Sequence, residues 1–129
     1  MKIGKIKIGL NHKPCIIAEV SGNHNKKLKN ALKLVEVAAN AGADMVKLQT
    51  YTPDTITLKS NKKDFLIEDK KSLWKNQNLY NLFKKGFTPW EWHPAIFKKA
   101  KKLGITCFSS VGSYLRETLD PVWYSINGL

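Results

Sequence analysis

Apolar residues follow one another along three short stretches of the chain, at residues 14–20, 44–50 and 105–109. Near-continuous apolar runs of this length are typical of strands buried on both faces of a parallel sheet. Between the first two stretches, apolar residues recur at helical spacing over residues 28–39, with lysines on the other side, and Gly42 follows as a helix-ending residue. A strand, a helix and a strand in this order predict a right-handed βαβ unit.

The segment that follows the second stretch is polar and rich in lysine from residue 53 to residue 72, which predicts a long loop or excursion. A short helix then follows, indicated by Leu79, Leu82 and Phe83 and closed by Gly86.

The residues before the third stretch have the pattern of a helix start. Thr88 is the predicted N-cap, Pro89 takes the first position, and Glu91 completes a capping box. Pro94 lacks the N–H group that a continuing helix needs, so we expect a break there and a main helix that runs on to Gly104.

The alternation of helices and strands continues to the end of the chain. Residues 114–119 indicate a short helix, and residues 122–126 indicate a fourth strand. The expected fold class is α/β, with three to four β/α units around a parallel sheet.

Length and composition limit the classes of protein that fit this pattern. With 129 residues, 43% hydrophobic and 25% charged, the chain resembles a folded soluble protein, and it is too short for a complete (β/α)8 barrel of about 250 residues. No stretch approaches the roughly 20 apolar residues of a membrane span, and the first residues contain no apolar signal core. We therefore expect a cytoplasmic protein with no membrane partner.

The net charge of +12 comes from 22 Lys and Arg residues against 10 acidic ones, and Arg116 is the single arginine. Proteins that read nucleic-acid sequence rely on arginine, whose planar fork pairs with guanine and phosphate. Scattered lysine pairs are typical of solvated surfaces. We expect no nucleic-acid partner, but a loose attraction to anionic metabolites.

Polar side chains interrupt the three apolar stretches at their carboxyl ends. They are Glu19 in the first, Lys47 and Gln49 in the second, and Ser109 and Ser110 at the end of the third. In parallel α/β folds, ligands bind at this edge of the sheet. Lys47 and Gln49 are two residues apart, which places both on one face of their strand.

A lysine within a buried strand is costly unless it meets a negative charge. One interpretation is an ion pair between Lys47 and Glu19 on neighbouring strands. The other makes Lys47 an anchor for an anion, with the Ser109 and Ser110 hydroxyls and backbone N–H groups binding phosphate and Gln49 orienting a substrate group. The sequence leaves both interpretations open.

The remaining candidates carry less information. Asn23 fits a helix N-cap as well as it fits a ligand. His24 and His93 are isolated histidines, and no Cys/His spacing typical of a metal site is present. We therefore expect no metal site built from this chain alone.

Two blocks of the sequence resemble a known family. Residues 17–24, IAEVSGNH, resemble the motif that opens the sialic acid synthase family. Residues 41–44, AGAD, and 46–50, VKLQT, are similar to the next block of that family, and the resemblance covers about residues 14–110 in register. The pseudaminic acid synthase branch is the most similar, through three further places: YTPD at 51–54, Leu-Trp at 73–74 and TPWEWH at 88–93.

The resemblance implies an activity and a set of partners. Enzymes of this family condense phosphoenolpyruvate with an N-acylated amino sugar, release phosphate and form a nine-carbon 2-keto acid used in surface carbohydrates. They use a divalent metal, Mn or Mg, on a (β/α)8 TIM-type barrel that is followed by a small antifreeze-like domain, and they form homodimers. The fold expected from the resemblance is therefore the first part of such a barrel.

The resemblance also implies roles for the candidate residues. Lys47 and Gln49 match phosphoenolpyruvate-site positions, and Ser110 matches a hydroxyl that holds the phosphate. Glu19 matches the active-site glutamate of the family, beside the turn that contains Asn23 and His24. The candidate catalytic residues are Glu19, Asn23 and His24, and the candidate phosphoenolpyruvate-binding residues are Lys47, Gln49, Ser109 and Ser110.

The chain departs from the family pattern near its end. Val111 and Gly112 stand where the family continues with Pro-Phe, and Ser125 stands at a phosphate-site lysine. The family's two metal-binding histidines would lie beyond Leu129. We therefore expect residues 1–129 to be an N-terminal fragment of the barrel, without the metal ligands, the rest of the barrel or the C-terminal domain, and inactive alone. The alternative is a non-catalytic βα module that binds an anionic metabolite or a partner subunit.

Overall fold

The computed structural model describes residues 1–3 and 5–111. The helix and strand expected at residues 114–119 and 122–126 lie outside the described residues, as does Ser125, so the expectations for them remain predictions. Within the described part of the chain, no helix is both long enough and apolar enough to span a membrane.

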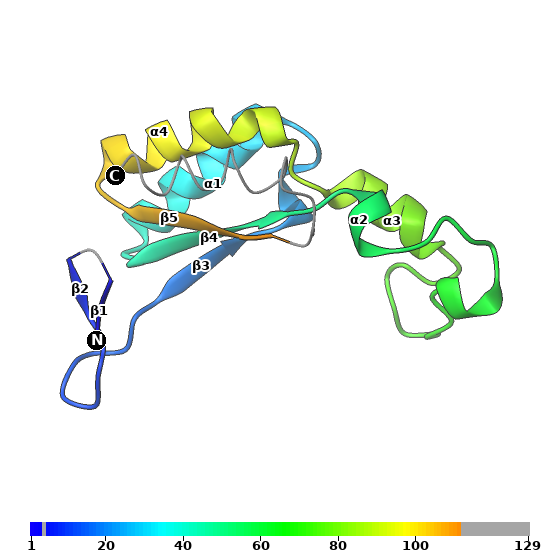
Figure 1. The fold of residues 1–129 in the computed structure, drawn as a ribbon, viewed down its shortest axis with the longest axis horizontal. Coiled ribbons are helices and arrows are strands. Elements are labelled where there is room, and N and C mark those ends of the chain that lie inside the picture. The colour runs from blue at the N-terminus through cyan, green and yellow to red at the C-terminus, as the bar shows by residue number, and fades with distance from the viewer. Residues whose placement is uncertain (4, 112–129) are drawn as a thin grey trace.

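Three parallel strands form the central sheet in the order β3–β4–β5 (Figure 1). They span Ile17–Val20, Met45–Thr50 and Thr106–Val111. Parallel neighbours require a long crossover connection, and here each crossover contains a helix that packs on the sheet. The α/β class and the parallel sheet predicted from the apolar stretches are confirmed.

Two helices cover one face of this sheet and lie side by side (Figure 1). They are α1, Leu28–Asn40, and α4, His93–Leu103. Gly42 and Gly104 follow them with φ values of +83° and +71°, a left-handed conformation that glycine adopts without the strain of a Cβ atom. Both glycines thus end the helices as predicted. The opposite face of the sheet carries no helix among residues 1–3 and 5–111.

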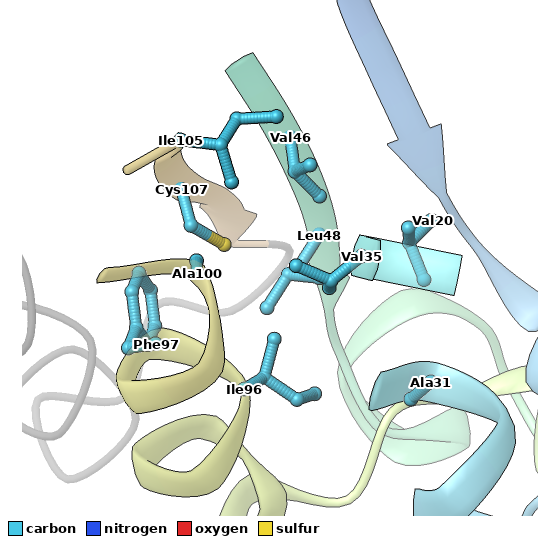
Figure 2. Close-up of a cluster of buried hydrophobic side chains, with 10 residues drawn as sticks. All are labelled: Val20, Ala31, Val35, Val46, Leu48, Ile96, Phe97, Ala100, Ile105 and Cys107. Carbon is cyan, nitrogen blue, oxygen red and sulfur yellow. The ribbon is translucent and has the colours of Figure 1, made fainter. Parts of the chain in front are cut away.

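The hydrophobic core lies between these helices and the sheet (Figure 2). Val46 and Leu48 of β4 are fully buried and belong to one cluster with Val35 of α1 and Ile96 of α4. Successive side chains of a strand point to opposite faces, so every second residue of β4 is buried under the helices.

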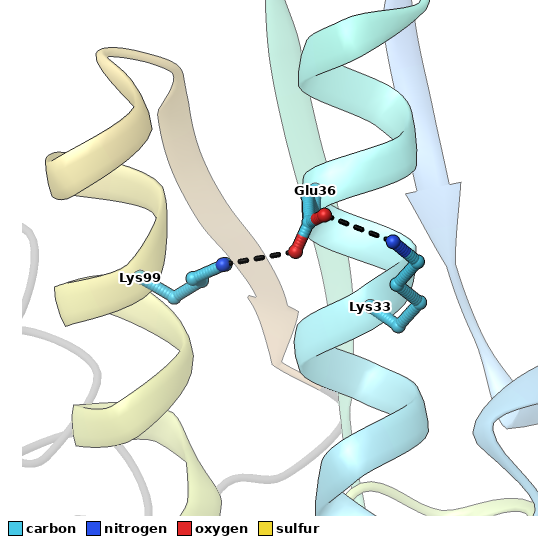
Figure 3. Close-up of polar contacts among 3 residues, drawn as sticks. All are labelled: Lys33, Glu36 and Lys99. Atoms are coloured by element: carbon cyan, nitrogen blue, oxygen red, sulfur yellow. Dashed lines mark hydrogen bonds and ion pairs between the residues drawn. The ribbon is translucent and has the colours of Figure 1, made fainter.

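Glu36 links the two helices across their surface (Figure 3). Its carboxylate oxygens accept hydrogen bonds from Lys33 of the same helix at 2.9 Å and from Lys99 of α4 at 3.0 Å. These two bonds and the positive charges of both lysines lower the pKa of Glu36 to about 2. Partly exposed ion pairs contribute little stability, so the main consequence is a fixed contact between α1 and α4.

The first strand departs from the prediction of a strand buried on both faces. β3 contains only residues 17–20, and Ile16 and Ile17 are 57% and 46% exposed, whereas Val20 is buried. The prediction is wrong here because no described helix covers the second face of the sheet, and β3 in addition lies at the edge of the described sheet.

The predicted helix start is partly wrong. Thr88 is not an N-cap, because its side chain is buried and its hydroxyl is hydrogen-bonded to His24. Trp90–Trp92 form a single turn of 3-10 helix, and α4 begins after it with Pro94 in its first turn, where no N–H partner is required. The expected break near Pro94 is confirmed.

The short elements were only partly predicted. α3, Leu79–Gly86, agrees with the sequence pattern. The polar segment before it contains α2, Pro53–Ile56, and a 3-10 turn, Lys63–Phe65, where a loop was expected. An antiparallel pair near the N-terminus, β1 Lys2–Ile3 and β2 Ile6–Lys7, was not predicted, because strands of two residues produce no measurable periodicity.

The core predicts a large difference between two leucine substitutions. Leu48→Ala removes a side chain that is 0% exposed, and we expect it to lower the free energy of unfolding by about 2–5 kcal/mol. Leu58→Ala is the matched control, because Leu58 is 69% exposed and its loss should change stability by less than about 0.5 kcal/mol. Urea unfolding followed by circular dichroism measures both, and equal effects would contradict this description of the core.

Candidate functional site

Four candidate residues share the face of the sheet that α1 and α4 leave open. In the sheet, Glu19 of β3 lies beside Lys47 of β4, and Gln49 of β4 lies beside Ser110 of β5. Residues paired in this way on neighbouring strands project to the same side. The neighbours of these residues along β4, such as Leu48, point into the core instead. The structure therefore brings Glu19, Lys47, Gln49 and Ser110 to one face at the carboxyl ends of the strands; the sequence predicts these ends and the shared face of Lys47 and Gln49.

Glu19 and Lys47 form an ion pair on this face. The carboxylate Oε1 of Glu19 lies 2.6 Å from Nζ of Lys47, and the two side chains are 48% and 31% exposed. The hydrogen bond from Lys47 and its positive charge lower the pKa of Glu19, and a hydrogen bond from Gln49 lowers it further. The ion-pair interpretation of Lys47 is confirmed.

The ion pair does not use every hydrogen-bond donor of Lys47. An ammonium group carries three N–H donors, and a single carboxylate contact occupies one of them in the described structure. The Lys47 side chain is 31% exposed, so its other donors are accessible from the open face. Anion anchoring by Lys47 therefore stays a prediction that is compatible with the geometry.

The two serines lie on opposite faces of β5. Ser110 is exposed on the open face, with its hydroxyl 3.4 Å from the carbonyl oxygen of Leu48. Ser109 faces the helices, and its hydroxyl oxygen is 2.5 Å from Oγ1 of Thr50. The structure thus brings Ser110 to the open face with Lys47 and directs the Ser109 hydroxyl to the core side.

His24 is completely buried and takes part in a fixed hydrogen-bond arrangement. Its Nδ1 accepts the backbone N–H of Lys26 at 3.1 Å, and its Nε2 lies 3.1 Å from the Thr88 hydroxyl. An amide N–H can only donate, so Nε2 carries the proton and donates it to Thr88. Burial lowers the pKa of His24, and the charge of Lys26 lowers it further. The imidazole is therefore neutral and holds two segments together.

Asn23 lies on the surface turn between β3 and α1. It is exposed within the 3-10 turn Gly22–His24, and the N-cap of α1 is Lys27, so the N-cap interpretation of Asn23 is wrong. A Cβ atom on Gly22 would lie 3.0 Å from the Cα of Gly86. A larger residue at position 22 would push against the backbone of Gly86, so the glycine lets the turn lie close to the end of α3.

Sequence reasoning missed three polar side chains that lie inside the structure. Thr50, Thr88 and His93 are each 1% exposed and hydrogen-bonded. The alternation of β4 could have placed Thr50 on the helix-covered face. No local signal indicates the burial of the other two, because their partners are 64 and 43 residues away along the chain.

A divalent metal is implied by the family resemblance, and the described residues do not fit one. Residues 1–3 and 5–111 bring no three His, Cys, Asp or Glu side chains together at a metal-binding spacing. Both ring nitrogens of His24 and of His93 are already hydrogen-bonded within the protein. No step of the chemistry is therefore assigned to a metal held by these residues.

Comparison with known proteins decides the family. The sequence profile of the NeuB family matches residues 34–119. The chain belongs to the NeuB family. It is 45% identical to the pseudaminic acid synthase of Campylobacter jejuni over 98% of this chain and 37% of that enzyme. Against the pseudaminic acid synthase of Helicobacter pylori, identity is 46% over 88% of this chain and 34% of that enzyme. This NeuB chain thus spans about a third of the length of these relatives.

Solved structures agree with this assignment. The N-acetylneuraminic acid synthetase of Leptospira borgpetersenii, crystallised with citrate, superposes with a TM-score of 0.69 at 25% identity and covers 97% of this chain and 38% of its own. The spore coat polysaccharide biosynthesis protein SpsE of Bacillus subtilis, at 24% identity, has the same fold with a TM-score of 0.65. The expected partial (β/α)8 barrel is confirmed as the fold of this NeuB chain.

The buried histidines predict that the NeuB chain loses stability in mild acid. Burial lowers the pKa of both His24 and His93. Their contribution is complete above the unfolded histidine pKa, about 6.5, and is lost as the pH falls through the folded value. Urea midpoints should therefore fall between about pH 7.5 and pH 5.5, where carboxylates stay ionised.

Variants separate this effect from other titrations. His24→Gln should make the pH dependence of the urea midpoint shallower, because one buried group that resists protonation is removed. His12→Gln, at an exposed position, is the control and should leave the slope unchanged. If the urea midpoint changed equally with pH in the unmodified chain and in both variants, His24 would not be a source of the acid sensitivity.

Proposed function

We propose that this NeuB chain supplies the phosphoenolpyruvate-binding part of a sugar-acid synthase. In the proposed reaction, phosphoenolpyruvate condenses with an N-acylated amino sugar, phosphate is released, and a nine-carbon 2-keto acid of the pseudaminic type is formed for surface carbohydrates. The observation that carries the proposal is the position of Lys47 beside Gln49 and Ser110 on the open face of the sheet. The names of the relatives support the class of product.

The donors on this face suit a ligand with two anionic groups. Phosphoenolpyruvate carries a phosphate and a carboxylate, and charge-assisted hydrogen bonds to such groups are roughly twice as strong as neutral ones. In the proposal, Lys47 binds one group through the donors that Glu19 leaves accessible. The Gln49 amide and the Ser110 hydroxyl orient the other group. Glu19 then accepts hydrogen bonds from hydroxyls of the sugar, on the same face.

The turn after β3 has a different part in the proposal. Asn23 is exposed at the end of that strand and is a candidate ligand of the substrate. His24 acts through structure, since both of its nitrogens are used in holding the turn to Thr88 and to the Lys26 backbone.

The remaining parts of the reaction need residues outside the described part. A divalent metal, Mn or Mg, would polarise the sugar carbonyl when bound, and the described residues offer no group of ligands for it. We therefore propose that the described part binds phosphoenolpyruvate and that turnover needs further residues. In the whole enzyme, proposed to be a cytoplasmic homodimer, the metal, the sugar and the dimer contacts involve further residues.

Lys47→Ala tests the proposed anion site. We expect phosphoenolpyruvate to raise the melting temperature of the unmodified chain, and Lys47→Ala to weaken its binding at least about ten-fold, because a charged hydrogen bond contributes about 1.5–3 kcal/mol. Lys99→Ala is a matched control, since Lys99 is also about one-third exposed, at 30%, and paired with a glutamate, but on the helices. Differential scanning fluorimetry and titration calorimetry measure both.

Two results would overturn the proposal. One is an unmodified chain whose melting temperature does not respond to phosphoenolpyruvate, and the other is an equal response in Lys47→Ala. Two further measurements separate a synthase from a general anion-binding module. Phosphate release during incubation with phosphoenolpyruvate, manganese and amino sugars would show a complete active site. A melting temperature that rises with inorganic phosphate alone would favour the anion-binding module.

Glu19→Gln tests how the ion pair affects the anion. The carboxylate of Glu19 repels a phosphate and occupies Lys47, so its neutral isostere should tighten phosphoenolpyruvate binding several-fold. Calorimetry at low and at high salt measures the change, and the gain should shrink as salt screens the charges. Weaker binding in Glu19→Gln would show that the pair is needed to hold Lys47 in place.

A further inference from the structure

A chain of buried hydrogen bonds connects the ends of β4 and β5 to the start of α4. Oγ of Ser109 lies 2.5 Å from Oγ1 of Thr50, and that oxygen lies 2.6 Å from Nε2 of His93. Nδ1 of His93 is 3.1 Å from the carbonyl oxygen of Trp90. Thr50 and His93 are each 1% exposed, so the bond between them is shielded from water, whereas the bonds to Ser109 and Trp90 are partly buried.

The donors and acceptors in this series of hydrogen bonds determine which group donates in each bond. The Trp90 carbonyl can only accept, so Nδ1 of His93 carries a proton. Burial lowers the pKa of His93 against the opposing effects of the Trp90 and Pro89 carbonyls and the charge of Glu91, so the ring is neutral and Nε2 is an acceptor. Thr50 must then donate to His93, so its oxygen can only accept from Ser109, whose hydroxyl also lies 3.1 Å from the Leu48 carbonyl oxygen and 3.2 Å from that of Ser110.

These hydrogen-bonded polar residues lie on a face of the sheet that is otherwise apolar. The other β4 and β5 residues under the helices are apolar and buried, among them Val46, Leu48 and Cys107. A buried hydroxyl gains little net stability and is costly when left unpaired, so apolar residues are the stable choice at such positions. The polar residues occur only at the carboxyl ends, directly beside the open-face residues Gln49 and Ser110.

Hydrogen bonds at this point fix the two strand ends relative to each other. Thr50 follows Gln49, and Ser109 precedes Ser110, so each bonded residue is attached to one that points to the open face. The bond between Thr50 and Ser109 thus adds a side-chain link beside the backbone pairing of Gln49 with Ser110. His93 determines which hydroxyl donates, and so holds the arrangement in one state.

We propose that His93 is a positioning residue for an anionic ligand on the open face, acting through Thr50 and Ser109 on the placement of Gln49 and Ser110. The inference deepens the proposed function and rests on it for the identity of the ligand, phosphoenolpyruvate. His93 does not touch the ligand in this proposal.

Matched variants at Thr50 and His93 test the hydrogen bonds that these two side chains form. Thr50→Val removes the hydroxyl and keeps the shape, whereas Thr50→Ser keeps the hydroxyl. The longer amide of His93→Gln reaches the place of Nε2 and can accept from Thr50, whereas the shorter amide of His93→Asn cannot. We expect Thr50→Val and His93→Asn to weaken phosphoenolpyruvate binding by about five-fold, and the conservative variants to stay within about two-fold.

Nuclear magnetic resonance provides a readout that does not depend on the ligand. The 15N spectrum of the unmodified chain should show His93 protonated on Nδ1. The amide resonances of Gln49 and Ser110 should shift in Thr50→Val and His93→Asn and stay in place in Thr50→Ser and His93→Gln. A structural role alone would lower the urea midpoint without this pattern.

The outcomes separate the two proposals. If the unmodified chain does not bind phosphoenolpyruvate but the amide shifts follow the expected pattern, the proposed function fails and the positioning by His93 stands. If phosphoenolpyruvate binds and all four variants bind it equally, or if the Gln49 and Ser110 amides do not move, the positioning role is wrong. A proton on Nε2 of His93 would also overturn it.

Discussion

The parallel pairing of β4 between β3 and β5 is the constraint on which the other features depend. Its side chains alternate between a core sealed by α1 and α4 and a face that the helices leave open. Val46 and Leu48 therefore stabilise the fold, while Lys47 and Gln49, the residues that follow each of them, lie on the open face. A slip of one residue in register would place the charged lysine in the core and expose the leucine.

Buried polar groups connect this sheet to the segment that precedes α4. His24, at the turn after β3, donates from Nε2 to Thr88, whereas His93 accepts at Nε2 from Thr50 at the end of β4. The two imidazoles are thus in opposite tautomers, each determined by a backbone group that can only donate or only accept. Residues 88–93 are consequently attached to the carboxyl ends of the strands by directional bonds as well as by packing.

Local sequence patterns predicted the parts of the fold that depend on local spacing. The apolar periodicity of residues 28–39 gave the extent of α1, because burial of one side of a helix repeats every three to four residues. The polar interruptions Glu19, Lys47, Gln49 and Ser110 indicated the carboxyl ends of the strands, and the alternation of a strand placed Lys47 and Gln49 on one face. Thr88 was misassigned as a helix cap, because a hydroxyl before a helix has the same local pattern whether it caps or bonds elsewhere.

The sequence by itself determined the three strands, the helices that connect β3 to β4 and lead into β5, and the residues that interrupt the apolar stretches. It left open whether Lys47 meets Glu19 or a ligand, and it assigned Ser109 and Ser110 to the same role. The tertiary structure decided that Lys47 and Glu19 form an ion pair and that the two serines lie on opposite faces. It also decided the partners of His24 and His93. Contacts between residues 43 or 64 positions apart depend on how the elements pack, and local spacing carries no information about that packing.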